Sequence, residues 1–246
     1  MTRILITGAS RGIGRAAALM AGARGWSVGV NYRDRRDAAD DVVVAVEKAG
    51  GRAIALQADV AQADDVARIF DRAEAAFGGL DAVVANAGIV APAMALAQTT
   101  PDRLERMVRV NLLGALLVAR EAARRLPRED GVTTSLTLMS SAAARLGSPG
   151  EFVDYAASKG AIDTLTLGLA KELGPRNVRV NAIRPGLIET EMQADSGIPD
   201  RATRLAGNIP MGRPGSADEV AEAIIWLASD AARYVSGAIL DVSGGR

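Results

Sequence analysis

Short β-branched segments alternate with longer segments of helical periodicity along the whole chain of 246 residues. The expected strands cover residues 3–7, 27–32, 52–58, 81–86, 133–139, 178–184 and 237–242. The expected helices lie near residues 12–25, 37–49, 62–77, 100–126, 151–173 and 216–229, and several end at a glycine (Gly25, Gly50, Gly78 and Gly174), as helix C-termini often do. Such alternation predicts parallel strands joined by crossover helices on both faces of the sheet. We therefore expect a single doubly wound α/β domain over residues 1–246, with about seven strands and with ligands at their carboxyl ends.

Two amino acids are missing from the chain, which restricts the chemistry it can perform. Without cysteine it forms no disulfide and has no thiolate nucleophile. Without histidine it has no Ser-His-Asp triad and no HExxH zinc site, and we expect no metal. Proton transfer must fall to Tyr, Lys, Asp or Glu. The 29 basic and 29 acidic residues cancel, so no overall field attracts nucleic acid or an anionic membrane.

Neither a signal peptide nor a membrane span is predicted. The first glycine-rich loop begins at Gly8, too early for a signal peptide. The longest uncharged segment, residues 82–101, contains Asn86 and Pro92 and predicts a strand and a loop. We therefore expect a cytoplasmic protein. Residues 186–215 form a long irregular region, and we predict a substrate lid over 187–213; the alternative is a disordered surface insertion.

The loop after the first expected strand has the pattern G-x-x-x-G-x-G, at Gly8, Gly12 and Gly14. Glycine permits positive φ there and lets backbone N–H groups approach a pyrophosphate at the start of the next helix. A tight turn without a ligand is the alternative. Two further strand ends favour a ligand, because Asp59-Val60 and Asn86-Ala87-Gly88 fall at the same sheet edge, where a dinucleotide would lie. No GxxxxGK[ST] phosphate loop occurs.

Tyr155 and Lys159 are one helical turn apart at the start of an expected helix, and so share a face. The chain has only 3 tyrosines, and 3 lysines against 26 arginines, so a chance surface pair is the weaker interpretation. A cation beside a phenol lowers the phenol's pKa, which predicts Tyr155 as an acid/base. Ser140 and Ser141 end the fifth expected strand. Without a histidine, a serine there is a hydrogen-bond donor to a substrate oxygen rather than a nucleophile, or a plain strand cap.

Together these motifs resemble the short-chain dehydrogenase/reductase family. The matching segments, in order along essentially the whole chain, are TGASRGIG (7–14), DV (59–60), NAG (86–88), VN (110–111), SS (140–141), YAASK (155–159), NAIRPGLIET (181–190), and YVSG with DVSGG (234–245). The resemblance implies a Rossmann-type sheet with its strands, numbered along the chain, in the order 3-2-1-4-5-6-7. It also implies hydride transfer between a nicotinamide ring and a carbonyl or alcohol carbon.

Residue by residue, the resemblance implies that Tyr155 is the acid/base and that Lys159 lowers its pKa and holds the nicotinamide ribose. Ser141 would orient the substrate oxygen, and Asn111, in the long helix 100–126, would hold a water of a proton relay. The predicted cofactor-binding residues are Gly8, Ser10, Arg11, Gly12, Ile13, Gly14, Arg33, Asp59, Val60, Asn86, Ala87, Gly88, Tyr155, Lys159, Pro185, Gly186, Ile188 and Thr190. The family's Asn-Asn-Ala-Gly is Ala85-Asn86-Ala87-Gly88 here, and the serine-to-tyrosine spacing is one residue longer, so Ser140 and Ser141 stay alternatives.

The end of the second expected strand, at Tyr32, bears on the choice of cofactor. NAD enzymes of this fold have a carboxylate there that accepts from the ribose 2′-hydroxyl. In this chain the acidic residue is Asp34, two positions further on, beside Arg33 and Arg35–Arg36. Arg11 in the glycine loop adds a further cation. Arginine binds phosphate bidentately, so we predict NADP(H) rather than NAD(H).

The substrate is predicted only as a small carbonyl compound or alcohol. A 3-oxoacyl chain on an acyl carrier protein is one candidate, because Arg124, Arg125 and Arg128 form a basic cluster; a solvated helix end is the alternative explanation of that cluster. A sugar or polyol dehydrogenase and a non-catalytic dinucleotide-binding regulator are the rival functions. Apolar residues on more than one face of helices 100–126 and 151–173, together with the resemblance, predict a homotetramer.

Overall fold

Seven parallel strands form the central sheet of the protein, in the order β3-β2-β1-β4-β5-β6-β9. The computed structural model describes residues 1–198 and 200–246, the side chain of Gln193 excepted. The strands are β1 (Arg3–Ile6), β2 (Ser27–Tyr32), β3 (Arg52–Gln57), β4 (Ala82–Ala85), β5 (Thr134–Met139), β6 (Val178–Pro185) and β9 (Ile239–Val242). Because β9 is the seventh expected strand along the chain, this order confirms the predicted doubly wound arrangement.

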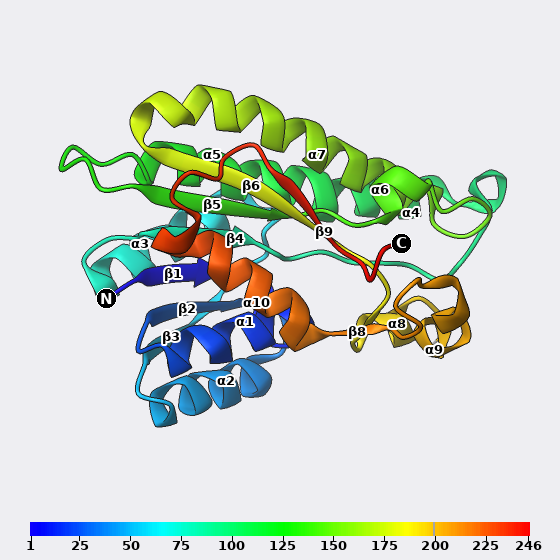
Figure 1. Cartoon of the computed structure of the whole chain (residues 1–246), viewed down its shortest axis with the longest axis horizontal. Coiled ribbons are helices and arrows are strands. Elements are labelled where there is room, and N and C mark those ends of the chain that lie inside the picture. Colours follow the sequence, from blue (N-terminus) through cyan, green and yellow to red (C-terminus); the bar gives the residue numbers. More distant parts are fainter. Residues whose placement is uncertain (199) are drawn as a thin grey trace.

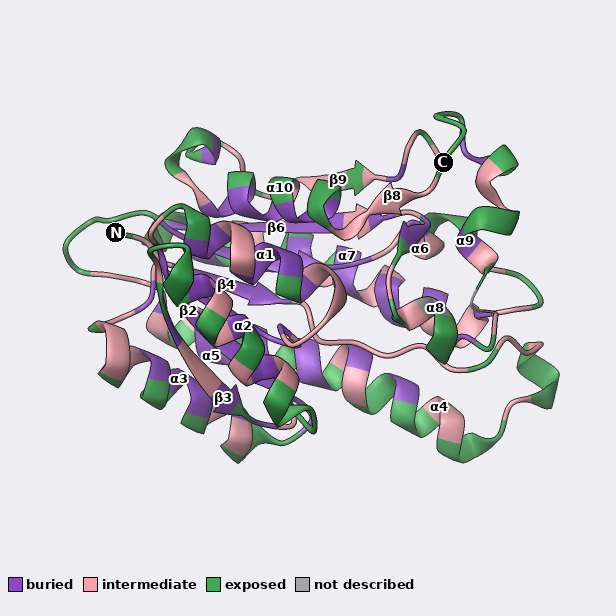
Figure 2. Ribbon diagram, turned by 90° about the horizontal axis from the view of Figure 1, so that it is seen from below, coloured by how far each residue is buried: buried purple, intermediate pink, exposed green. Residues whose placement is uncertain are grey.

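Helices cover both faces of the sheet (Figure 1). On one face lie α1 (Gly12–Ala23), α2 (Arg36–Lys48) and α10 (Ala217–Ala228), and on the other α3 (Ala63–Phe77), α5 (Gly114–Arg125) and α7 (Val153–Leu173). Successive residues of a strand point to opposite faces, so Ile4 and Ile6 enter one core and Leu5 the other. Figure 2 shows the buried strands between the two helical layers.

The parallel register aligns the carboxyl ends of the strands along one edge. Ile6 pairs with both Val30 and Val84, and Tyr32 pairs with Gln57. The glycine loop and the segments after β3 and β4 therefore leave the sheet at the same edge, as predicted for the site.

The helix expected over residues 100–126 is interrupted. It consists of α4 (Pro101–Met107), a π-helical stretch η2 (Val108–Leu113), and α5. A π-turn accommodates an extra residue and so changes the direction of the side chains within it. Asn111 lies in this stretch with only 1% of its surface exposed, bonded to the segment after β4. The departure from the expected regular helix is thus accompanied by hydrogen bonds between this buried side chain and Ile89 and Met107.

The lid region contains regular structure in its described part. It comprises β7 (Ile188–Glu189), α8 (Met192–Asp195), α9 (Arg201–Arg204), η4 (Ala206–Asn208) and β8 (Gly215–Ser216), and β7 pairs in parallel with β8. Figure 1 shows α8 and α9 beyond the carboxyl edge of the sheet. The remaining short helices are η1 (Leu96–Gln98), α6 (Ala143–Leu146), η3 (Gly174–Arg176) and η5 (Asp230–Ala232).

Three of the four expected helix-ending glycines adopt the left-handed conformation that ends a helix. Gly25, Gly50 and Gly78 have φ of 74°, 93° and 79°. Gly174 was expected to do the same, but its φ is −52° and the chain continues into η3. Asn177, with φ of 58°, takes the left-handed position instead, because asparagine tolerates it better than most residues. Among the described residues, no helix has the length and apolar character that a membrane crossing requires.

Candidate active site

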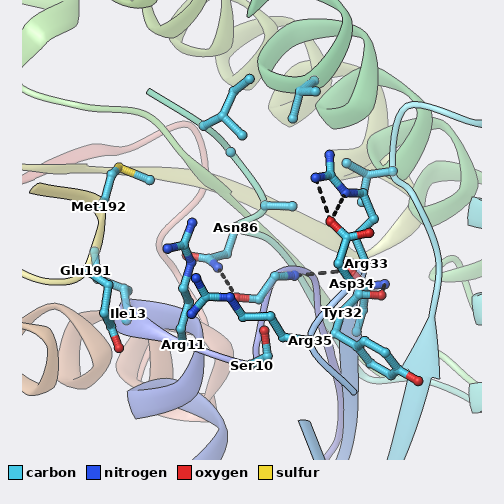
Figure 3. A pocket seen from close by; sticks show the side chains of 18 of the residues that line it. Ser10, Arg11, Ile13, Tyr32, Arg33, Asp34, Arg35, Asn86, Glu191 and Met192 are labelled. Atoms are coloured by element: carbon cyan, nitrogen blue, oxygen red, sulfur yellow. Dashed lines mark hydrogen bonds and ion pairs between the residues drawn. The ribbon is translucent and has the colours of Figure 1, made fainter. Parts of the chain in front are cut away.

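A groove along the carboxyl edge of the sheet contains most of the residues predicted to bind a cofactor (Figure 3). Its volume of about 340 Å³ lies in the range of small-molecule sites. The predicted residues that line it are Gly8, Ser10, Arg11, Gly12, Ile13, Arg33, Asp59, Val60, Asn86, Ala87, Gly88 and Thr190. Tyr32 at the end of β2, Asp34 and Arg35 after it, and Glu191 and Met192 of the lid also line it but were not predicted as binding residues.

The glycine loop presents bare backbone to this groove. Gly8 and Gly12 have φ of 64° and 53°, which side chains rarely tolerate. A Cβ added at Gly14 would lie 2.5 Å from both the Asn86 Nδ2 and the Gly8 carbonyl oxygen. Arg11, which precedes α1, makes no side-chain cap, so the first N–H groups of α1 and its positive end are available to an anion.

Asn31 fixes the glycine loop and was not identified from the sequence. Its Oδ1 accepts from the Gly8 N–H at 3.1 Å, and its Nδ2 donates to the carbonyls of Leu56 and Ala58 at 3.0 and 3.2 Å. The side chain is 2% exposed, so it joins the ends of β2 and β3 to the loop. The available signal was one polar residue at the end of an otherwise apolar strand, SVGVNY.

Asn86 and Asp59 shape the groove from the other strand ends. The Asn86 Nδ2 donates to the carbonyls of Thr7 and Gly8 at 2.8 and 3.2 Å. Asp59 closes its own turn, because its Oδ1 accepts from the Ala61 N–H at 2.9 Å. Both side chains thus hold the backbone that a ligand would contact.

Tyr155 and Lys159 lie in the first turns of α7, as expected. The Lys159 Nζ donates to the Met139 carbonyl at 2.7 Å and lies 5.6 Å from the centre of the Tyr155 ring. Burial lowers the pKa of Lys159 to about 8, partly opposed by Asp163. Burial also raises the pKa of the Tyr155 phenol, and the hydrogen bond with Ser141 opposes this rise. The expected lowering of the Tyr155 pKa is therefore wrong for this structure, because desolvation of the phenol outweighs the stabilising contact.

The two serines after β5 have different partners. The Ser140 hydroxyl is 3% exposed and donates to the Lys159 carbonyl at 3.1 Å. The Ser141 hydroxyl hydrogen-bonds with Tyr155 and accepts from the Ala143 N–H at 3.1 Å. Of the two serines, Ser141 therefore has its hydroxyl beside Tyr155, and Ser140 has its hydroxyl on the backbone of Lys159.

Asn111 joins the π-helical stretch to the end of the groove. Its Oδ1 accepts from the Ile89 N–H at 2.8 Å and its Nδ2 donates to the Ile89 carbonyl at 2.9 Å. A Cβ added at Gly88 would lie 3.3 Å from this Oδ1 and 3.6 Å from the Lys159 Nζ. The structure thus brings Asn111, Lys159 and the end of the groove together.

The predicted residues after β6 are only partly brought to the groove. The Thr190 side chain lines it and lies within 3.6 Å of a Cβ added at Gly12. Gly186 packs against Ser243, and its N–H donates to the Val242 carbonyl at 3.0 Å. Ile188 is 5% exposed and packs in the core on the α1 side of the sheet. Pro185 and Gly186 lie outside the groove lining too, so the roles of these three residues stay predictions.

Ion pairs engage several arginines at the site. The Arg33 Nη2 lies 2.6 Å from the Asp34 Oδ2, and this hydrogen bond raises the pKa of Arg33; Figure 3 shows the pair after β2. The Arg11 Nη2 lies 2.7 Å from the Asp195 Oδ2 of α8. The glycine loop is thereby tied to the lid.

The basic cluster at the end of α5, formed by Arg124, Arg125 and Arg128, is neutralised within the chain. Arg125 pairs with Asp71, Glu74 and Glu121 at 2.6, 2.9 and 3.1 Å. Arg128 pairs with Asp81 at 3.0 Å and also with Asp130, and Arg124 lies 3.4 Å from Glu121. Asp71, Glu74 and Asp81 come from other parts of the fold, whereas Glu121 and Asp130 are neighbours in the sequence. The cluster is therefore not a patch of free positive charge.

Comparison with known proteins agrees with this geometry. A family model described as enoyl-(acyl carrier protein) reductase matches residues 8–246. The chain is 46% identical to the uncharacterized oxidoreductase YgfF of Escherichia coli, over 100% of both chains. It is 40% identical to the 3β-hydroxysteroid dehydrogenase 1 of Eggerthella lenta, over 98% of this chain and 92% of that one.

Two solved structures have the same fold and were determined with nicotinamide cofactors. A short-chain dehydrogenase from Burkholderia cenocepacia in complex with NADP has a TM-score of 0.91 and 35% identity, covering 99% of this chain and 97% of that one. A 3-ketoacyl-(acyl-carrier-protein) reductase from Brucella melitensis complexed with NADH has a TM-score of 0.92 and 31% identity, covering 100% and 98%.

Proposed function

Since the chain belongs to the short-chain dehydrogenase/reductase family of oxidoreductases, we propose that Tyr155 is the acid/base of hydride transfer between a nicotinamide cofactor and a carbonyl or secondary alcohol carbon. The observation that carries the proposal is the position of Gly88, which lines the groove and lies beside Asn111 and Lys159. Lys159 contacts the face of Tyr155, and Tyr155 hydrogen-bonds with Ser141. A substrate oxygen bound near these groups has both a proton donor and a hydrogen-bond donor.

The residues present fit a dinucleotide. Bare glycine backbone and the uncapped start of α1 suit a pyrophosphate, which Gly12 and Ile13 would hold. Asp59 and Val60, with Asn86 to Gly88, would flank the adenosine half, and Tyr155 with Lys159 would hold the nicotinamide ribose. Pro185, Gly186, Ile188 and Thr190 would hold the carboxamide side. When bound, the cofactor supplies or accepts the hydride.

A protonated Tyr155 can serve the carbonyl reduction that we propose. Burial raises the pKa of its phenol, so the hydroxyl keeps its proton at neutral pH. A neutral phenol can donate that proton to the carbonyl oxygen as hydride reaches the carbon. Ser141 would donate a hydrogen bond to the same oxygen, and the buried Lys159 ammonium would stabilise the phenolate that remains. Asn111 would position the water that returns the proton.

We propose NADP(H) as the preferred cofactor. Arg33 and Arg35 line the groove after β2, and the only carboxylate between them, Asp34, is already paired with Arg33. A 2′-phosphate at this position would meet guanidinium groups, whereas a 2′-hydroxyl would find its acceptor engaged.

We propose that the substrate is an alicyclic or open-chain carbonyl compound. A relative named as a hydroxysteroid dehydrogenase supports a carbonyl on a ring. A carrier-bound 3-oxoacyl chain is supported by the name of the Brucella structure, but no longer by Arg124, Arg125 and Arg128, which are paired with acidic residues of this chain. Sugar or polyol oxidation is the rival.

We propose further that the protein acts as a homotetramer in the cytoplasm. Leu113 and Leu116 on η2 and α5, and Leu167 on α7, are 40%, 39% and 46% exposed. Leucines exposed on neighbouring helices suit a helical interface between subunits.

A substrate panel tests the reaction. Aldehydes, open-chain and alicyclic ketones, ketoacyl thioesters and sugars are offered with each cofactor, and the nicotinamide absorbance is followed. We expect carbonyl reduction with NADPH. Tyr155→Phe should lower kcat by roughly 10²–10⁴-fold while NADPH affinity stays within about twofold.

Tyr234→Phe is the matched control, because that side chain is fully exposed and its hydroxyl should have no effect. Wild-type turnover by Tyr155→Phe would refute the mechanism and favour another acid/base. Nucleotide binding by the wild-type protein without turnover of any substrate in the panel would favour a non-catalytic regulator. Turnover confined to sugars with NAD⁺ would refute both the cofactor and the direction.

A further inference from the structure

We infer that Arg103 and Asp154 are positioning residues for Tyr155, an inference that rests on the proposed function. Asp154 directly precedes Tyr155 in the first turn of α7, and its Oδ1 accepts from the Tyr155 backbone N–H at 2.9 Å. Arg103 of α4 donates to the same carboxylate through Nε at 2.8 Å and through Nη2 at 3.2 Å. The pair therefore connects α4 to the backbone of the reacting residue.

The pair is buried, so its geometry is constrained. The side chains of Arg103 and Asp154 are 12% and 4% exposed. The pKa of Asp154 is lowered overall. Burial raises it, but the hydrogen bonds from Arg103 and from the Tyr155 N–H, together with the charge of Arg103, outweigh the effect of burial. The carboxylate thus stays ionised and accepts from both donors at once. A bidentate guanidinium–carboxylate pair has a fixed planar geometry, which lysine cannot reproduce.

Arg103 also holds the segment after β4. Its Nη1 donates to the Pro92 carbonyl. This segment is bonded at Ile89 to Asn111, and the Ala93 N–H donates to the Ser196 carbonyl of the lid at 3.0 Å. The Arg103 guanidinium therefore joins the turn of Tyr155 to residues 89–93. We call this segment, which is bonded to Asn111 at one end and to the lid at the other, the wall.

The two residues consequently have separable effects. Asp154 hydrogen-bonds with the Tyr155 N–H and with Arg103, so its loss should misplace the phenol. Arg103 contacts that turn and the wall at Pro92, so its loss should affect substrate binding as well. Small displacements of a reacting group cost up to about 100-fold in rate.

The test compares Asp154→Asn, Arg103→Met, Arg103→Lys and the double variant Arg103→Met/Asp154→Asn with the wild-type protein. The readouts are kcat and KM for the best carbonyl substrate of the panel, NADPH affinity by fluorescence titration, and melting temperature. Arg3→Met is the matched control: Arg3 makes a similar pair with Asp81, 2.8 Å from Nε to Oδ2 and 19% and 20% exposed, at the opposite end of β1.

We expect Asp154→Asn to lower kcat about tenfold with KM nearly unchanged, and Arg103→Met to lower kcat by about 10–100-fold and raise KM. The double variant should have the kcat of Arg103→Met, because both substitutions remove the same ion pair. Arg103→Lys should have a kcat between those of Arg103→Met and the wild-type protein. NADPH affinity should stay within about twofold in all of them. Arg3→Met should lower the melting temperature alone.

The inference would be overturned if kcat were unchanged in both Asp154→Asn and Arg103→Met. It would also be overturned if their loss of kcat were no larger than that of Arg3→Met. Asp154→Asn preserves side-chain size, so it decides the matter even if Arg103→Met folds poorly. An inactive Tyr155→Phe beside fully active Arg103 and Asp154 variants overturns this inference alone. An active Tyr155→Phe overturns the proposed function first.

Discussion

Lys159 is a buried cation that its surroundings stabilise only in part. It is 5% exposed and has one hydrogen bond, to the Met139 carbonyl. Its pKa is lowered from 10.5 to about 8, so between these two values the unfolded chain binds a proton that the folded chain has released. Stability from this group therefore rises with pH across that window, by about 1.4 kcal/mol per unit. Below pH 8 the folded protein carries the full cost of the buried charge.

Lys159→Met should therefore stabilise the protein at pH 7 while abolishing turnover. Removing the charge should gain about 1–3 kcal/mol after the lost hydrogen bond is counted, or roughly 2–10 °C in melting temperature. The gain should shrink as the pH rises from 8 to 10. Melting curves at pH 7 and 10 without nucleotide measure it, with the exposed Lys171→Met as control. A variant less stable than wild type at pH 7 would contradict this account.

Residue spacing was enough to predict part of the site. The i, i+4 rule brought Tyr155 and Lys159 together, and glycine chemistry identified the loop around Gly12. The direction of the Tyr155 pKa could not be predicted, because it depends on burial by tertiary contacts. The role of Asn31 could not be predicted for a similar reason: three of its hydrogen-bond partners, Gly8, Leu56 and Ala58, lie in segments distant in the chain.

At the scale of elements, the turn between β2 and α2 sets the proposed cofactor preference. Arg33→Asp removes a guanidinium from the groove, releases Asp34 and adds a second carboxylate. The ratio of NADPH to NADH affinity should fall by at least about tenfold, since carboxylates repel a 2′-phosphate and accept from a 2′-hydroxyl. Fluorescence titration measures both affinities.

Arg36→Asp is the control, because Arg36 begins α2 with a side chain 74% exposed and paired with Asp40. It should leave the affinity ratio nearly unchanged. Tighter binding of NADH than NADPH by the wild-type protein would end the proposal of NADP(H) preference.

The start of α1 offers a second test at this scale. Gly14→Ala introduces a Cβ at 2.5 Å from the Asn86 Nδ2 and the Gly8 carbonyl, so the loop or Asn86 must move. NADPH affinity should fall by at least about tenfold, because the backbone N–H groups lose their alignment. Gly207→Ala in η4, where an added Cβ meets nothing within 4 Å, is the control. Equal affinities in the two variants would show that Gly14 has no such role.

The order of elements was predictable and their local irregularities were not. Each strand can be identified as a short β-branched segment between segments of helical periodicity. This alternation arises because helices must cover both apolar faces of the sheet. The π-helical stretch at Asn111 departs from a regular helix by a small local change that hydrophobic periodicity does not resolve. After α7 the left-handed residue is Asn177, at the end of η3, rather than Gly174, because either residue could take that conformation.

For the whole molecule, the exposed leucines on α5 and α7 predict self-association. Leu167→Glu should reduce the mass measured by light scattering at micromolar concentration, because a charge would be buried at the interface. Val44→Glu on α2 is the control, since Val44 is 49% exposed and lies on the other layer. A monomeric wild-type protein would contradict the proposed tetramer.

The ion pair between Arg11 and Asp195 has a thermodynamic consequence for the whole molecule. A ligand that binds the Arg11 guanidinium competes with the Asp195 carboxylate of α8. Binding of that ligand in the groove is therefore coupled to release of α8 from the glycine loop. By reciprocity, any molecule that moves α8 must change nucleotide affinity by the same factor. The two side chains are 31% and 41% exposed, and pairs of this kind are worth about 0–1 kcal/mol. The resulting cooperativity between two ligands that never touch is therefore modest, at most about fivefold.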